Sequence, residues 1–250
     1  MKRIVLTFLI LFSFLFVNAQ EYAPQMNFVK FNLSSVVFKN FTFQYERVLS
    51  KRFSAALSFG IIPRTTIPYA QFTLDFANGE QEIVKLLEDV RFNYYAITPE
   101  VRLYLGRKGY GRGFYIAPYY RYTSIGVKEA RLNFDEESDH PFHLDINGGI
   151  GGHSGGIMLG SQWGLGKYVT LDWWIMGLAF GVSNIRADGV PSQSIPQEAL
   201  ADMREGLTDL FSEIPIAKVK TLEVNQNHMK LEVTGPWAGL RGGLVLGVKF

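Results

Sequence analysis

The C-terminal segment constrains the fold more than any other part of the chain. Side chains alternate from Trp237 to Phe250, and the chain ends on that phenylalanine. One set is Ala238, Leu240, Gly242, Leu244, Leu246, Val248 and Phe250, and the other is Trp237, Gly239, Arg241, Gly243, Val245, Gly247 and Lys249. Since a strand points successive side chains to opposite faces, one face is apolar and the other is small and mixed, with two cations. A long strand of this kind suits a wall between lipid and a wet lumen.

Upstream segments alternate in the same way. Together with the last one they predict eight strands, at about 27–38, 41–47, 53–61, 92–105, 114–134, 142–163, 169–181 and 237–250. We therefore predict an all-β fold, an antiparallel up-and-down transmembrane β-barrel of eight strands whose long outer loops carry short helices. A further alternating segment, Thr221 to Val233, raises the count to ten if it joins the wall.

The connections between these segments follow a regular order of length. Short turns fall at Lys39–Asn40 and near Ser50, Gly109 and Gly166, and long excursions follow Ile61, Gly126 and Val182. If the first strand runs outward from the periplasm, every long excursion lies outside, and Lys39–Asn40 is the one short outer turn. Outer-membrane barrels have short periplasmic turns and long outer loops. The order of connections therefore favours that class over a soluble sandwich.

Two features conflict with regular strands. Pro99 and Pro118 lie inside predicted strands, where each removes a hydrogen-bond donor from the ladder. Either the two prolines mark bulges, or the two strands that contain them cross the membrane at a different height from the other strands. The glycine run Gly148 to Gly152 predicts a bulge in the sixth strand, so the parity of the residues before it is open.

Two stretches of the long excursions have helical patterns. Glu80 to Val90 predicts a short helix. Ser194 to Glu213 predicts a longer one, because Ser194 and Gln197 match a capping box and Pro196 suits a first turn. Its apolar stripe is Leu200, Met203, Leu207, Leu210 and Phe211. This helix either packs on the rim of the barrel for stability, or serves as a lid over its mouth or as a contact for a receptor.

The N-terminus has the pattern of an export signal. A basic start, Met1 to Arg3, precedes an apolar run from Ile4 to Val17, and Ala19 offers the small residue that signal peptidase needs. We predict a signal peptide over 1–19 and a barrel domain over 20–250. The apolar run is shorter than the ~20 residues that span a bilayer, which disfavours a membrane anchor.

Composition excludes several kinds of site. The 250 residues contain no cysteine, which excludes disulfides, thiolate zinc sites and cysteine nucleophiles. The net charge of +2 gives no reason to expect nucleic acid as a partner. Asp139 to Asp145 contains two of the four histidines, but their spacing matches no known zinc pattern. We expect no metal and no cofactor.

The inward face of the predicted barrel carries charged residues. They are Lys30, Glu46, Glu100, Arg102, Arg121, Asp172 and Arg241. Because side chains fill an eight-stranded barrel and isolated buried ions are costly, these charges must pair. We interpret them as an ionic plug that closes the lumen; the alternative is a path for an ion or substrate. Outward aromatic residues form the predicted interfacial girdles, namely Phe43, Tyr45, Phe53, Tyr120, Trp163, Trp173 and Phe250.

These features resemble the small outer-membrane barrels of Gram-negative bacteria typified by OmpA, OmpX and OmpW, and the uncharacterised barrel families of Bacteroidetes-type bacteria. The resemblance implies an integral outer-membrane protein whose terminal Phe250 is read by the barrel assembly machinery. It implies that outer-membrane lipid surrounds the barrel. It also implies a non-enzymatic role, either in membrane integrity or in binding an unknown extracellular ligand or protein through the outer loops. An OmpW-like conduit for small apolar molecules is the alternative.

Some related barrels are hydrolases that remove acyl chains from lipid A through a His, a Ser and an acidic residue. His153 and Ser154 raise this question. Adjacent strand residues point to opposite faces, and counting from Trp163 places His153 outward and Ser154 inward. The two cannot act as partners, and we expect no enzymatic activity.

Overall fold

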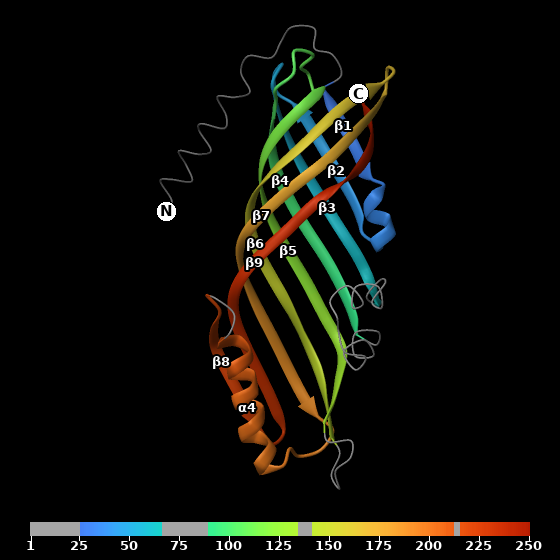
Figure 1. Cartoon of the computed structure of the whole chain (residues 1–250). Coiled ribbons are helices and arrows are strands. Elements are labelled where there is room, and N and C mark those ends of the chain that lie inside the picture. Colours follow the sequence, from blue (N-terminus) through green and yellow to red (C-terminus); the bar gives the residue numbers. More distant parts are fainter. Residues whose placement is uncertain (1–25, 67–89, 135–141, 213–215) are drawn as a thin grey trace, which may run out of the picture.

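The computed structural model describes residues 26–66, 90–134, 142–212 and 216–250, and these are nearly all antiparallel β-structure (Figure 1). The strands are β1 Asn27–Asn32, β2 Phe41–Val48, β3 Phe53–Thr66, β4 Arg91–Tyr104, β5 Gly113–Phe134, β6 Phe142–Leu165, β7 Val169–Pro191, β8 Lys218–Asn225 and β9 His228–Lys249. The helices are the 3-10 helix η1, Ser34–Phe38, and the α-helix α4, Gln197–Ser212. Among the described residues, no helix is long and apolar enough to cross a membrane.

The strands close into a barrel-like ring. Each strand from β1 to β7 pairs antiparallel with the next, β7 pairs with β9, and β9 pairs with β1. The ring therefore has eight strands, which confirms the predicted fold class. The segment from Thr221 to Val233 does form a hairpin, but among the described strands β8 pairs only with β9, and it does not enlarge the ring. The count of ten strands in the wall is wrong, because β8 joins β9 where β1 has already ended.

Short connections gather at one end of the ring, which also carries the C-terminus (Figure 1). They join β2 to β3, β4 to β5 and β6 to β7. The η1 connection lies at the other end, from which the chain also leaves β3, β5 and β7. The predicted signal peptide at 1–19 lies outside the described residues, and so does the predicted helix at 80–90 apart from its last residue.

The first strand is shorter than predicted. It ends at Asn32 instead of Phe38, and η1 follows. The side-chain oxygen of Asn32 accepts a hydrogen bond from the Ser35 amide at 3.1 Å, and Lys39 closes the turn with a left-handed φ of 56°. A side chain that bonds to the following backbone competes with the strand ladder, which explains the early end of β1.

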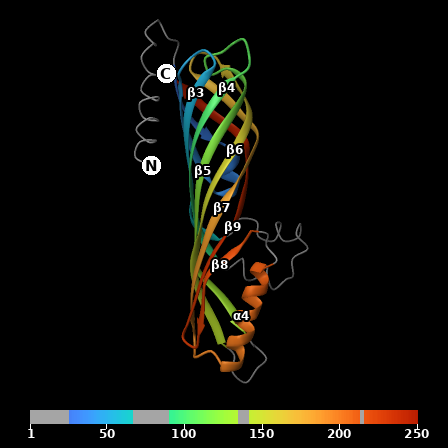
Figure 2. The same ribbon diagram turned by 90° about the vertical axis from the view of Figure 1, so that its left-hand side faces the viewer.

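The opposite wall is longer than predicted. The predicted outer excursion began at Val182, but β7 continues to Pro191 and pairs with β9 as far as Gly189↔Met229. Each of these two segments supplies the ladder that the other needs. As a result β5, β6, β7 and β9 extend well beyond the short strands β1 and β2 (Figures 1 and 2).

We call this extension the projecting sheet: residues 124–134, 142–151, 184–191, 218–225 and 228–234. Helix α4 packs on its inner face, against Leu144 and Met229, which are buried. Both residues have the parity of the lumen-lining positions on their strands. Leu200, Met203 and Leu207 of the predicted stripe belong to this apolar cluster. The apolar stripe of the helix therefore packs on the sheet, in agreement with the alternative in which the helix stabilises the barrel.

The glycine run does not contain a bulge. Gly148 to Gly152 pairs in one register with both neighbouring strands; the β5 ladder shifts just beyond the run, between Val127 and Ala130, where the extra residue is on β5, and the β7 ladder shifts between Leu159 and Gly160. The predicted bulge is wrong. One reason for the glycines is space, since a Cβ on Gly152 would lie 2.7 Å from the ring of Trp237.

The two prolines weaken one seam without shifting it. Pro99 pairs with Leu57 on β3, and Pro118 pairs with Ile157 on β6. Between β4 and β5 the pairing is interrupted near both prolines, yet the register stays the same on either side. The missing donors thus fall on a single ladder, and neither proline marks a bulge.

Candidate functional site

The interior of the ring is polar, whereas its exterior is rich in large apolar side chains. Buried charged residues include Lys30, Glu46, Arg102 and Asp172, all at 1% exposure or less. The seven aromatic residues predicted for the girdles are all exposed, namely Phe43, Tyr45, Phe53, Tyr120, Trp163, Trp173 and Phe250. This arrangement reverses that of a soluble domain, in which the large apolar residues are inside.

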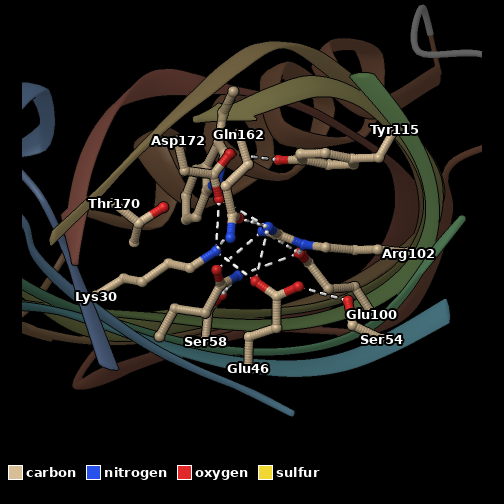
Figure 3. A network of polar contacts seen from close by, with 12 residues as sticks. Lys30, Glu46, Ser54, Ser58, Glu100, Arg102, Tyr115, Gln162, Thr170 and Asp172 are labelled. Carbon is tan, nitrogen blue, oxygen red and sulfur yellow. Dashed lines mark hydrogen bonds and ion pairs between the residues drawn. The ribbon is translucent and has the colours of Figure 1, made fainter. Parts of the chain in front are cut away.

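Six of the seven predicted lumen charges meet in one network, which we call the plug, and Figure 3 shows five of them, Lys30, Glu46, Glu100, Arg102 and Asp172. Its charged members are Lys30, Glu46, Glu100, Arg102, Asp172 and Arg241. Neutral residues complete it, namely Gln44, Ser54, Ser58, Tyr104, Tyr115, Gln162 and Trp174. Every strand of the ring contributes at least one residue. The plug thus ties together strands that are more than 140 positions apart in sequence.

Arg102 is the central cation. Its Nη1 lies 2.7 Å from Asp172 Oδ2 and 3.1 Å from Glu46 Oε2. Its Nε donates to Glu100 Oε1 at 2.7 Å, and its Nη2 donates to Gln44 Oε1 at 2.8 Å. The planar guanidinium with five donors suits such a set of acceptors, which a single ammonium group cannot match.

Lys30 is a second cation of the plug, and it contacts two of the carboxylates that Arg102 also contacts, Glu46 and Asp172. The Lys30 ammonium pairs with Glu46, lies 2.8 Å from Asp172 Oδ2 and donates to Gln162 Oε1. Tyr115 donates to the free oxygen of Asp172 at 2.9 Å. Glu46 and Asp172 therefore each have two cations and two neutral donors, namely Ser54 and Tyr104 for Glu46 and Tyr115 and Trp174 for Asp172, which offset the cost of removing the carboxylates from water.

Arg241 covers the plug on the side of the projecting sheet. Its Nη1 pairs with Glu100, and its Nη2 donates to Ser58 Oγ at 2.9 Å. Its guanidinium carbon lies 4.0 Å from the centroid of the Trp174 ring, a cation–π contact. The plug then holds three cations and three carboxylates, so that its formal charge is zero.

Arg121 does not join the plug, in contrast to the prediction. It lies on the same inner face, but it donates to Thr98 Oγ1 at 3.0 Å and to the Tyr94 hydroxyl. The physical reason is its height in the barrel. Tyr119 stands one inward position nearer the plug on the same strand, and Arg241 stacks near that ring, 5.5 Å from its centroid.

Sequence patterns gave different amounts of information about the neutral members of the plug. The alternation already places Gln44, Tyr104 and Tyr115 inward. Gln162 has the inward parity when counted from Trp163, yet nothing in its neighbourhood marks it as a partner of Lys30. A tyrosine or glutamine in an inward position is an ordinary lumen filler, so only proximity across the ring reveals its role.

The glycines of β6 make room for the plug, which leads to a prediction. A Cβ on Gly160 would lie 2.3 Å from the Tyr115 hydroxyl oxygen, the donor to Asp172. We expect Gly160→Ala to lower the free energy of unfolding by about 1–3 kcal/mol through overpacking. Gly155→Ala on the same strand is the control, because no atom of the described residues lies within 4 Å of its Cβ position. Denaturant titrations of both variants, followed by tryptophan fluorescence, check this; equal losses would contradict it.

The outer face changes character at a definite height. On β9 the outward residues are apolar from Val248 to Pro236, and on β7 they are apolar from Val169 to Val182. Beyond that height the next three outward residues are polar on each strand, namely Asn184, Arg186 and Asp188 on β7 and Thr234, Glu232 and Lys230 on β9; further along β7, Val190 is apolar and exposed. We call the apolar part the outer band.

Aromatic residues with polar atoms stand at the edge of the outer band. His153 pairs with Val182 across β6 and β7, and it contacts Tyr120 and Tyr122 of β5. The Tyr120 hydroxyl lies 2.6 Å from His153 Nδ1.

On the projecting sheet, a hydrogen bond from Arg131 lowers the pKa of Asp145 below its ordinary value.

The remaining predicted features are placed as follows. His153 points outward and Ser154 is buried, so the two lie on opposite faces as expected. Phe250 pairs through its backbone with Asn27, and its side chain is exposed. His140 lies outside the described residues. In the described part of the chain, no group of three or more His, Asp or Glu residues is placed to hold a metal ion.

Comparisons with known proteins give no family assignment. No model of a protein family matches this sequence, and no curated protein matches it.

Proposed function

We propose that this chain is an integral outer-membrane β-barrel protein of a Gram-negative bacterium, exported by the signal peptide at 1–19. The observation that carries the proposal is the reversed polarity of the ring, with a charged interior and an apolar exterior. Exposure of the apolar outer band to water would cost a large amount of free energy, whereas the hydrocarbon of a membrane would cover it without that cost.

The dimensions of the outer band support this location. From Pro236 to Phe250 the strand rises roughly 45 Å, at about 3.3 Å per residue. With a strand tilt of about 40°, this corresponds to a height of roughly 35 Å, which covers a hydrocarbon core of about 30 Å and part of the interface. Tyr120, Tyr122 and His153 then stand at the outer interface, where amphipathic rings gather.

The role that the geometry favours is non-enzymatic. The plug fills the lumen with paired charges, and the projecting sheet with α4 forms a packed unit beyond the outer band. A protein that only seals the membrane would need no such unit. We therefore propose that the projecting sheet binds an extracellular ligand or protein, and that Phe250 addresses the chain to the barrel assembly machinery.

The test is the cellular location and folded state of the full chain. We expect it in the outer-membrane fraction and resistant to cold detergent, with a different gel mobility before and after boiling. Recovery of a folded monomer in detergent-free buffer would overturn the proposal. A conduit is the second candidate, and steady conductance in planar bilayers would favour it. The plug supports the opposite expectation, a closed lumen.

A further inference from the structure

A cavity of about 130 Å³ lies in the lumen on the outer side of the plug. Its polar lining includes Tyr94, Arg121 and Arg241, and its apolar lining includes Ile125, Trp237 and Leu240. Arg241 belongs to the plug and therefore marks the inner limit of the cavity. The space combines positive charge with aromatic and aliphatic walls, and the proposed function does not use it.

Arg121 gives the cavity its net charge. The plug is balanced without it, and the two groups to which Arg121 donates are neutral hydroxyls. No carboxylate of the described residues lies within ion-pair distance of its guanidinium. Arg121 is partly buried, and a partly desolvated guanidinium without a carboxylate partner has donors free to pair with an anion. The cavity is thus suited to one negative charge.

The cavity also reaches the free edge of β9. Between Gly235 and Gly243, no described strand pairs with β9 on the side that faces β1, since that pairing ends at Asn32↔Val245 and β8 begins only at Thr234. Leu240 lies in this stretch and is 77% exposed. It has the outward parity of Leu244, yet it lines the cavity. A side chain of the outer band therefore forms part of the wall of an inner space.

We infer that this cavity binds a monoanionic amphiphile with a carboxylate head and an alkyl chain. The carboxylate pairs with Arg121, whose contacts with Thr98 and Tyr94 use two of its five N–H donors. The alkyl chain leaves past Leu240 along the free edge of β9, within the outer band. The inference rests on the proposed membrane location for the surroundings of that chain.

A carboxylate fits better than the other anionic heads. It carries one charge, which balances that of Arg121, and its two oxygens match the planar fork of a guanidinium. A phosphate monoester would bring a second negative charge that no cation of the cavity other than the already paired Arg241 could meet. The small volume likewise favours a compact head over a glycerophospholipid head.

The test is equilibrium dialysis of radiolabelled decanoate against the full chain, folded in neutral detergent micelles, below the concentration at which decanoate forms micelles. We expect saturable binding of about one decanoate per chain. Arg121→Gln should weaken it roughly 10- to 100-fold, because a charge-assisted bond is lost. Gly239→Leu should weaken it comparably, because Gly239 lines the cavity and, in the part of the chain that the structure describes, no atom within 4 Å of its Cβ position blocks the new side chain.

Arg186→Gln is the matched control, since Arg186 lies on the projecting sheet, and it should bind as the unchanged chain does. Acetate and decanol should show no saturable binding. Equal affinity of Arg121→Gln and the unchanged chain would overturn the inference, and so would acetate binding as tight as that of decanoate. Absence of saturable binding to a chain that still shows heat-modifiable mobility would overturn the inference alone. Loss of that mobility in every preparation would instead contradict the proposed function.

Discussion

Replacement of Arg102 by methionine is expected to lower the free energy of unfolding by about 3–5 kcal/mol. The guanidinium contacts Glu46, Glu100 and Asp172, all of which are fully buried. Without it, Lys30 alone must balance Glu46 and Asp172. A buried carboxylate that loses its cation keeps its desolvation cost and loses its compensation, so that the effect is far larger than that of a surface ion pair.

The measurement is a denaturant titration of the chain refolded in lipid vesicles, followed by gel mobility and tryptophan fluorescence. Arg186→Met is the control, because Arg186 is exposed and lies 3.7 Å from Glu232; its change should stay below about 0.5 kcal/mol. Adding Asp172→Asn to Arg102→Met restores the charge balance of the plug and should recover about 1 kcal/mol or more. If the double variant is no more stable than Arg102→Met, the loss comes from packing and not from charge.

A charge in the middle of the outer band should produce the second largest effect. Leu244 is exposed and lies near the midpoint between Pro236 and Phe250. We expect Leu244→Arg to cost about 2–4 kcal/mol when the chain folds in a bilayer, because an arginine at the midplane must be brought into hydrocarbon. Folded yield in vesicles and the free energy of unfolding both report this cost.

Val190→Arg is the matched control for this prediction. Val190 is also outward-facing and 56% exposed, but it lies on the projecting sheet beyond the outer band. Its replacement should change stability by less than about 0.5 kcal/mol. Similar, small costs for both variants would show that water and not hydrocarbon covers Leu244, and the proposed location would then fail.

The alternation of side chains was sufficient to predict most of the wall. Period-two patterns located all eight strands of the ring, because one buried face forces such a pattern on each of them. The ends of the strands were predicted less well. β1 ends at Asn32, where a local hydrogen bond competes with pairing, and β7 runs to Pro191 because β9 is there to pair with it. Neither cause can be read from the alternation of one segment alone.

The charged members of the plug were also predictable, since the parity of each strand placed them inside. Their partners were not. Gln162 accepts a hydrogen bond from Lys30, 132 positions away in sequence, and Tyr104 donates one to Glu46, 58 positions away. Arg121 shows the limit most clearly, because its parity is right but its height above the plug leaves it with neutral partners. Parity gives the face of a side chain, and the register between strands gives its height.

The sequence by itself therefore determined that this chain forms a closed antiparallel wall with a charged inner face and an apolar outer face, since both follow from short-range alternation. Only the tertiary structure decided which charges pair, that Arg121 stands apart from them, and along which stretch β9 has no partner among the described strands. These properties depend on the stagger between neighbouring strands and on their unequal lengths. Both are fixed by pairings between segments far apart in the chain, which local patterns do not record.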